Sequence, residues 1–465
     1  MSAGGHESLS ARAAAHEAVS AVLRREGFVS EVLAGLRQAG RLAPRETGLA
    51  TETALGTVRH LLTIETVLRS VATYEPHNVA PELRAVLCTA AYQALWLDRV
   101  PLFAAVNEAV ALAHERVSHR AAGMVNAVLR RLTGAIETRV TAWQPGAPHQ
   151  VRTGWAQACA LRQPVFPPAD PDLEAYVAAA AGERPARLRT LVERLGWEAA
   201  LQVAWASQAV PPLVVQRNRG RVDAAAFTAA VRAAFGADVL CDGDTAYLTP
   251  GTALVDAELF QAGLCYVQDS TAQAAALLVG AQPGERVLDL CAAPGGKTAL
   301  LAAAVGARGE VVACDVAPQR LIQVSANADR LGLACVRTHL LSADGPTGVE
   351  GRFDAAIADV PCSNTGVLAR RPEARLGLTA QKVASLADLQ RGLIRQAAAC
   401  VRPGGRLVYS TCCLEPEENE RVVDDFLFDQ PAWRLVEART TLPAWGATAA
   451  EWRDGGFAAL LEQRG

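Results

Sequence analysis

The chain has 465 residues, of which 51% are hydrophobic and 20% are charged, and its formal net charge is −3. This composition excludes a disordered chain, and the length is enough for about three domains. No stretch has the roughly 18 consecutive apolar residues of a membrane span, and residues 1–15 lack the apolar core of a secretion signal. The 11 cysteines are scattered along a long chain, so we expect a cytoplasmic protein without a disulfide framework.

Residues 1–140 are predicted to form an all-helical domain. Apolar residues recur at three- and four-residue spacing, and turn-forming residues such as Gly27 and Gly40 separate the periodic stretches. The expected helices are Ala13–Arg25, Val29–Ala39, Arg45–Leu68, Pro81–Leu97, Phe103–Arg116 and Ala121–Leu132. This periodicity indicates a helical bundle and does not by itself indicate a function.

Two further segments precede the region that contains the functional motifs. Residues 141–210 begin with a stretch rich in Pro, Gly and Ala, which predicts a linker with a short helix, and a helical pattern follows from Pro185 to Ser207. Residues 211–262 are predicted to form a small α/β domain. Its expected strands lie at 213–217, 239–241 and 246–248, and its expected helix lies at 224–234. The remaining residues, 263–465, form the third and largest predicted domain.

The segment Asp289-Leu-Cys-Ala-Ala-Pro-Gly-Gly-Lys-Thr298 lies between a strand-like run and a helix-like run. Open α/β sheets hold nucleotide-like cofactors with an acidic residue, a glycine pair and the start of a helix. The glycines let the backbone approach the ligand. A phosphate-binding P-loop is excluded, since that motif needs glycine where this chain has Cys291. Lys297 supports a functional loop, because the chain has only one other lysine, Lys382.

Two further acidic residues are candidates for contacts with the same cofactor. Asp315 ends the next predicted strand and lies about 20 residues after Gly295, where such folds bind a ribose. Asp344 follows a strand-like run that begins at His339, and it is placed for the base end of the cofactor. A carboxylate that faces solvent explains the Asp344 pattern equally well.

Two cysteines follow predicted strands. Cys362 comes after the run Phe353–Asp359, and Cys412 ends the run that begins at Gly405. Both would lie at the carboxyl edge of a parallel sheet, where ligands bind in open α/β folds. The sequence has no C-x-x-C pair and no histidine cluster beside these residues, so a metal site is not expected. A single cysteine at such a position could simply be a buried core residue. Two cysteines at the ends of two strands predict instead a thiolate nucleophile.

Together these motifs resemble the RNA cytosine-5 methyltransferases of the NOL1/NOP2/Sun family. The resemblance rests on Asp289–Thr298, Asp359–Ser363 and Ser410–Cys413, and flanking matches lie at Gln268–Gln273 and Pro416–Asn419. It implies that the third domain is a Rossmann-like α/β methyltransferase domain with S-adenosylmethionine as its cofactor.

The resemblance also implies a role for each site residue. Cys412 would add to C6 of a cytosine, which makes C5 nucleophilic enough to take a methyl group, and Cys362 would assist release. Asp359 would hold the base, and Lys297 would lie near that carboxylate. Cys413 is a departure, because the family usually has serine after the nucleophile, and it leaves open which thiol reacts. The implied cofactor-binding residues are Cys291, Ala292, Ala293, Pro294, Gly295, Gly296, Lys297, Asp315, Asp344 and Asp359.

The helical N-terminal domain resembles the NusB-like RNA-binding domain, through the runs Arg45–Arg59, Val106–Val110 and Val125–Arg131. In bacteria this domain is fused to the family member that acts on small-subunit (16S) ribosomal RNA. The resemblance therefore implies a ribosomal RNA methyltransferase that makes 5-methylcytosine. Its expected partner is RNA, and neither a bound metal nor association with a membrane is expected. Nothing in the sequence demands more than a monomer. The alternatives are a transfer RNA cytosine-5 methyltransferase and a non-catalytic RNA-binding or ribosome-assembly factor.

Overall fold

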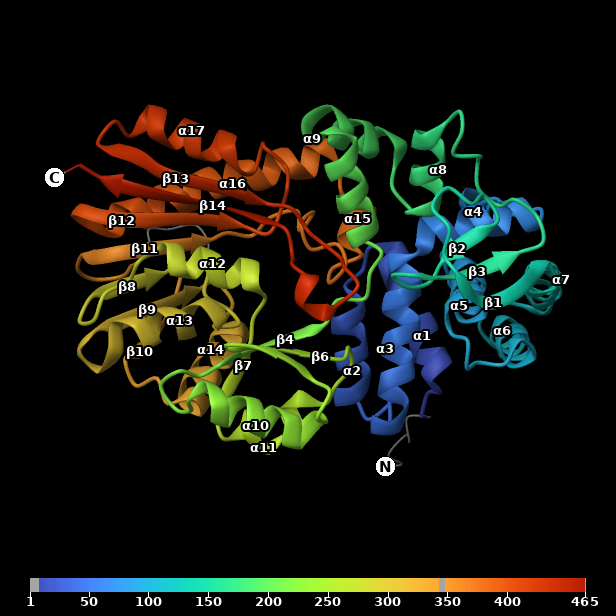
Figure 1. Cartoon of the computed structure of the whole chain (residues 1–465), viewed down its shortest axis with the longest axis horizontal. Coiled ribbons are helices and arrows are strands. Elements are labelled where there is room, and N and C mark those ends of the chain that lie inside the picture. The colour runs from blue at the N-terminus through green and yellow to red at the C-terminus, as the bar shows by residue number, and fades with distance from the viewer. Residues whose placement is uncertain (1–7, 343–347, 465) are drawn as a thin grey trace, which may run out of the picture. The chain divides into compact units, whose positions relative to one another are not determined.

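The computed structural model describes residues 8–342 and 348–464, and its chain divides into two compact units. The first unit consists of Met1–Ala209 and the short segment Arg371–Gly377. The second consists of Val210–Arg370 and Leu378–Gly465. The colours of Figure 1 follow the chain through both units.

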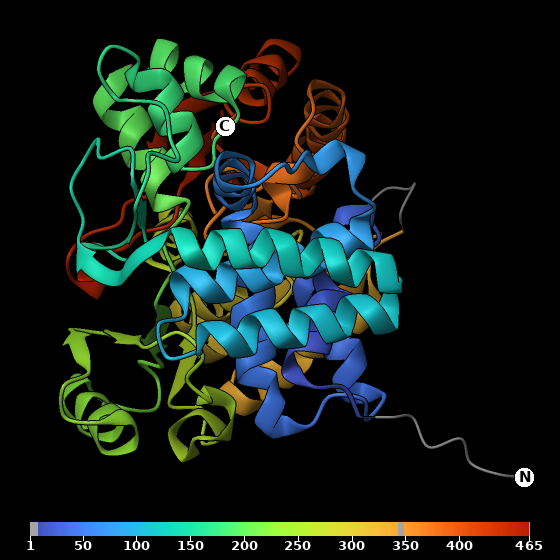
Figure 2. The ribbon, with the colours of Figure 1, turned by 90° about the vertical axis from the view of Figure 1, so that its right-hand side faces the viewer.

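Seven helices begin the first unit: α1 (Ala11–Arg24), α2 (Val29–Gln38), α3 (Pro44–Arg59), α4 (Leu61–Val71), α5 (Pro81–Trp96), α6 (Leu102–Arg116) and α7 (His119–Ala135). Helices α6 and α7 pack side by side as a pair (Figure 2). The single helix predicted for residues 45–68 is two helices, α3 and α4, separated at His60. The His60 ring is buried and stacks on Trp96 of α5, with 4.3 Å between ring centroids. The break coincides with a contact between helices, which the local periodicity of the sequence does not show.

A three-stranded antiparallel sheet, in the order β1-β3-β2, begins at Ile136 inside the predicted all-helical range and extends into the range predicted as a linker. Its strands and the two helices that follow are β1 (Ile136–Ala142), β2 (Gln150–Arg152), β3 (Gln157–Leu161), α8 (Leu173–Ala180) and α9 (Pro185–Ala206). The guanidinium of Arg152 lies 3.8 Å from the ring centroid of Trp143 and 5.0 Å from that of Trp205. These cation–π contacts join residues far apart in the sequence, so a composition rich in Pro and Gly concealed an ordered subdomain.

A four-stranded antiparallel sheet, in the order β5-β6-β4-β7, begins the second unit. Its elements are β4 (Leu213–Arg217), α10 (Ala224–Phe235), β5 (Leu240–Asp242), β6 (Thr245–Leu248), α11 (Glu258–Gln261) and β7 (Cys265–Val267). Phe227 and Val231 of α10 are buried against Val215 and Leu248 of the sheet. The predicted strands and helix are present, and β7 adds a fourth strand.

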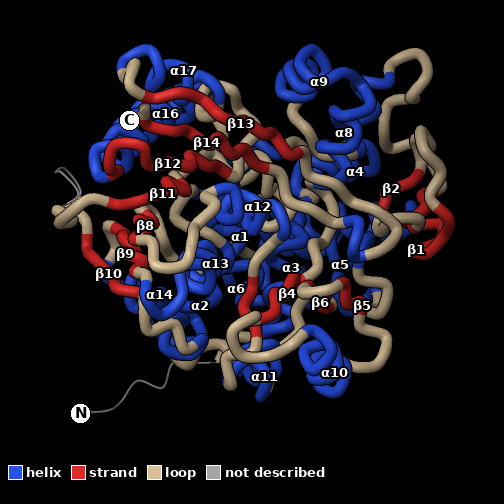
Figure 3. The backbone as a smooth tube through the Cα atoms, turned by 60° about the vertical axis from the view of Figure 1, so that its left-hand side comes forward, coloured by secondary structure: helices blue, strands red, loops and turns tan. Residues whose placement is uncertain are grey.

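A seven-stranded sheet forms the core of the rest of this unit, in the order β10-β9-β8-β11-β12-β14-β13 (Figures 1 and 3). The strands are β8 (Arg286–Asp289), β9 (Glu310–Asp315), β10 (Val336–Leu340), β11 (Phe353–Asp359), β12 (Val401–Thr411), β13 (Trp433–Thr441) and β14 (Gly456–Gln463). Strands β8 to β12 are parallel, and β14 runs antiparallel to both of its neighbours. The chain builds outward from β8 in one direction and then from β11 in the other, so β8 and β11 flank the switch point where such sheets bind ligands.

Helices cover both faces of this sheet. They are α12 (Ser270–Leu278), α13 (Gly296–Val305), α14 (Pro318–Leu331), α16 (Ala380–Cys400) and α17 (Glu420–Asp429). Leu301 of α13 packs with Ile357 on one face, whereas Ile394 of α16 and Phe426 of α17 pack with Leu407 on the other. The central strands are buried on both faces, which gives a three-layer α/β/α domain and confirms the predicted fold class. None of the helices within the described residues combines the length and the apolar character that crossing a bilayer requires.

Candidate active site

Asp289, at the end of β8, fixes the glycine loop that follows it. Its Oδ2 accepts a hydrogen bond of 2.7 Å from the hydroxyl of Thr298 in the first turn of α13. Burial raises the pKa of Asp289 to about 7. Gly295 has a φ of 103°, a left-handed conformation that glycine adopts without strain, and it directly precedes α13. The N–H groups at the start of α13 therefore lie at the carboxyl edge of the sheet.

Asp315, at the end of the adjacent strand β9, is almost fully buried. Its Oδ1 accepts a hydrogen bond of 3.0 Å from the backbone N–H of Ala317. Its Oδ2 receives no hydrogen bond from the described residues and lies 3.3 Å from Nη1 of Arg320. Nη2 of the same arginine donates to the carbonyl of Ala293 in the glycine loop. A buried carboxylate oxygen without a donor fits the hydroxyl groups of a ribose. The loop and Asp315 thus fit a nucleoside cofactor such as S-adenosylmethionine. The other predicted acid, Asp344, lies outside the described residues.

Lys297 and Asp359 form an ion pair between the glycine loop and the end of β11. Nζ of Lys297 lies 2.6 Å from Oδ2 of Asp359, and the Ser410 hydroxyl donates to Oδ1 at 2.7 Å. Burial lowers the pKa of Lys297, but the charge of Asp359 and the hydrogen bond to it outweigh that effect, and the pKa is raised overall. Both oxygens of Asp359 are thereby oriented, and the contact with Lys297 is the one that the family resemblance implies.

The two predicted cysteines meet at the ends of neighbouring parallel strands. Sγ of Cys362, which follows β11, lies 3.3 Å from Sγ of Cys412, which follows β12. The hydrogen bond with Cys412 and burial raise the pKa of Cys362 well above the usual value for a thiol. Asn364, with a φ of 61°, donates from Nδ2 to the carbonyl of Cys362 and accepts at Oδ1 from the thiol of Cys412. The sheet register therefore brings two thiols within contact that lie 50 residues apart.

Cys413 and Cys291 are the other two cysteines in the site loops, and the thiol of Cys413 interacts with that of Cys362. Cys413 is fully buried, and its Sγ lies 3.3 Å from Oγ1 of Thr411 and 3.4 Å from Oδ1 of Asn419. Cys291 packs against the apolar core of the sheet, and burial raises its pKa. Cys412, unlike these two, lines a pocket, which favours it as the reactive thiol.

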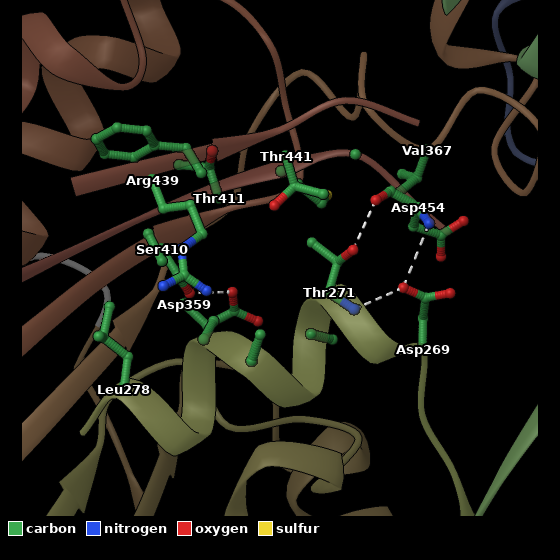
Figure 4. Close-up of a pocket in the computed structure, with 18 of the residues that line it drawn as sticks. Asp269, Thr271, Leu278, Asp359, Val367, Ser410, Thr411, Arg439, Thr441 and Asp454 are labelled. Atoms are coloured by element: carbon green, nitrogen blue, oxygen red, sulfur yellow. Dashed lines mark hydrogen bonds between the residues drawn. The ribbon is translucent and has the colours of Figure 1, made fainter. Parts of the chain in front are cut away.

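The pocket next to Cys412 also contains Lys297 and Asp359. Asp359 and Ser410 lie on one side of it, and a hydrogen-bonded group of Asp269, Thr271 and Asp454 lies on the other (Figure 4). Burial and the nearby charge of Asp269 raise the pKa of Asp454 to about 6.

The sequence did not indicate Arg439 and Thr441, which also line this pocket. Both belong to β13, an edge strand that reaches the pocket only because it pairs with β14, which pairs with β12. No local motif marks them. Only recognition of this antiparallel addition to the sheet could have placed them near Cys412.

Comparisons with known proteins agree with this arrangement. The family described as "16S rRNA methyltransferase RsmB/F" matches residues 276–451, and the NusB family matches residues 9–134. The chain is 31% identical to the ribosomal RNA small subunit methyltransferase B of Pseudomonas putida, over 92% of this chain and 91% of that protein. The chain belongs to the ribosomal RNA small subunit methyltransferase B family.

Two further relatives support this assignment and the fold. A probable ribosomal RNA small subunit methyltransferase B of Bacillus subtilis is 28% identical, over 91% of this chain and 89% of that protein. The crystal structure of PH0851 covers 98% of this chain and 99% of its own, with a TM-score of 0.74 and 20% identity, so it shares the fold. The family confirms the predicted resemblance and S-adenosylmethionine as the cofactor, whereas the roles of the individual site residues remain predictions.

Proposed function

We propose that this protein methylates C5 of a cytosine in small-subunit ribosomal RNA, through a covalent adduct between the base and Cys412. The observation that carries the proposal is the 3.3 Å distance between the sulfur atoms of Cys362 and Cys412, where Cys412 lines a pocket that also contains the Lys297–Asp359 pair. Two thiols and an oriented carboxylate are the groups that this reaction needs. The relatives named for small-subunit ribosomal RNA support the substrate.

Formation of the adduct is the task of Cys412. C5 of cytosine is a poor nucleophile, so a thiolate at Cys412 adds to C6, forms an S–C6 bond and moves the C5=C6 electron pair toward C5. Asp359, held by Lys297 and Ser410, faces the same pocket and would bind N3 and the exocyclic amine as charge develops. When bound at the glycine loop, S-adenosylmethionine supplies the methyl group that C5 takes.

Release requires loss of the C5 proton. A base takes this proton, the C5–H electron pair re-forms the C5=C6 double bond, the S–C6 bond breaks and Cys412 leaves as a thiolate. We assign Cys362 to assist this step, because its sulfur lies 3.3 Å from the leaving sulfur. The target base must leave its stack to reach Cys412, which costs least in single-stranded RNA.

A covalent-trap assay tests the proposal. Cys362→Ala protein is mixed with S-adenosylmethionine and unmodified small-subunit ribosomal RNA, and a protein–RNA adduct that resists denaturant is sought on a gel. We expect an adduct that disappears in the Cys362→Ala/Cys412→Ala double variant. An adduct with transfer RNA but not with ribosomal RNA would mean that transfer RNA is the substrate. No adduct with either RNA, from folded protein that binds the cofactor, would exclude the covalent mechanism.

A further inference from the structure

Two adjacent residues, Glu418 and Asn419, contact both cysteine loops. They directly precede α17, and their side chains are buried. Neither lines the pocket, so neither is placed to touch a substrate. Burying a carboxyl group and an amide group costs free energy unless both groups form hydrogen bonds.

Glu418 acts on the loop of Cys362. Its Oε2 accepts a hydrogen bond of 2.8 Å from the backbone N–H of Ser363 and one of 2.9 Å from Nε2 of Gln390. The same Nε2 of Gln390 donates to the carbonyl of Pro361 at 2.8 Å. The residues before and after Cys362 are therefore both held, and the Cys362 backbone has little freedom to shift.

Asn419 acts in the same way on the loop of Cys412. Its Oδ1 accepts a hydrogen bond of 2.6 Å from the hydroxyl of Thr411, and its Nδ2 donates to the carbonyl of Cys413 at 3.2 Å. The Cys413 carbonyl can only accept, so it determines which way the amide points. The residues on both sides of Cys412 are thus held by one side chain.

We propose that Glu418, together with Gln390, positions Cys362, and that Asn419 positions Cys412, so that one dipeptide sets the spacing of the two thiols. The inference rests on the proposed function, since it takes Cys412 as the attacking thiol and Cys362 as the release thiol. Each residue then controls a different step. Loosening the Glu418 contacts impairs release, whereas loosening the Asn419 contacts impairs attack.

Glu418→Met tests the release step, because methionine has a similar length and accepts no hydrogen bond from Ser363. Misplacement of a reacting group by about 1 Å can cost a hundredfold, so we expect adduct breakdown to slow by about tenfold or more, with accumulation of the adduct. Glu418→Gln keeps an acceptor and should restore breakdown. Glu417→Met is the matched control, since Glu417 is partly exposed and pairs only with the exposed Arg421 among the described residues.

Asn419→Asp tests the attack step, because it keeps the acceptor for Thr411 and loses the donor to the Cys413 carbonyl. Adduct formation should slow by about tenfold without accumulation. Single-turnover reactions with labelled RNA measure both rates for each variant. Affinity for S-adenosylmethionine should stay within about twofold of the unmodified protein, because neither side chain contacts the glycine loop.

The outcomes separate this inference from the proposed function. If Cys362→Ala traps no adduct, the proposed function itself fails. If Cys362→Ala traps an adduct but folded Glu418→Met does not, or if both variants slow attack and release equally, the positioning roles are refuted. Gln390→Met removes the hydrogen bond to the carbonyl of Pro361, on the other side of Cys362. This variant replaces Glu418→Met in the test if Glu418→Met does not fold.

Discussion

The carboxylate of Asp315 should contribute strongly to cofactor affinity. Its buried Oδ2 lies in an ion pair with Arg320 but receives no hydrogen bond from the described residues, so it can still accept one from a ribose hydroxyl. A hydrogen bond to a charged group is worth about 1.5–3 kcal/mol. Asp315→Ala should therefore weaken S-adenosylmethionine binding by roughly 10- to 150-fold. The variant also loses the acceptor for Ala317, but that loss lowers the stability of the fold and does not enter the binding equilibrium directly.

Isothermal titration calorimetry with S-adenosylmethionine, without RNA, measures this effect. Asp388→Ala is a suitable control, because the Asp388 side chain is 80% exposed and forms a surface pair with Arg391. Asp315→Asn keeps the shape and loses the charge, so its affinity should lie between those of the other two variants. A dissociation constant for Asp315→Ala within about twofold of the unmodified protein, with the fold intact, would remove Asp315 from the cofactor site.

Three further predictions concern the thiols, the pocket rim and the buried acid. Cys412→Ala should abolish methyl transfer in a labelled-methyl assay while cofactor affinity is kept. Cys413→Ala should stay active, because the Cys413 thiol is buried and does not line the pocket. The reverse pattern would make Cys413 the nucleophile. Arg439→Ala should raise the KM for RNA severalfold at constant kcat, because this exposed cation, which pairs with Glu437, lies at the pocket where a phosphate would approach. A fall in kcat alone would contradict a binding role. The pKa of Asp289 is about 7 in the folded protein and about 4 in the unfolded protein. As the pH rises, the unfolded state therefore loses this proton first, and the stability of the fold decreases between about pH 4 and pH 7. Asp289→Asn, which can still accept from Thr298, should stabilise the protein more at pH 8 than at pH 5 in urea unfolding, and an equal effect at both values would refute the shift.

Local patterns predicted most of the elements correctly. The strand, glycine loop and helix around Asp289–Thr298 were predictable because the loop chemistry lies within ten consecutive residues. Helices α2, α6 and α7 were predictable because burial of one face imposes a period that is visible in the sequence. The prediction failed where the deciding contact was distant. His60 lies at an unpredicted helix break and stacks on Trp96, and Arg152 in the presumed linker packs on Trp143 and on the distant Trp205.

The candidate site shows the same division. The sequence by itself determined which residue types stand at the strand ends: the glycine loop, Asp315, Asp359 and the two cysteines. Only the tertiary structure decided that Cys362 and Cys412 touch, that Cys413 is buried outside the pocket lining, and that β13 brings Arg439 to the pocket. It also decided that Glu418 and Asn419 hold both cysteine loops. The physical reason is that a motif depends on neighbours along the chain, whereas distances between side chains on different strands depend on the order and register of the sheet.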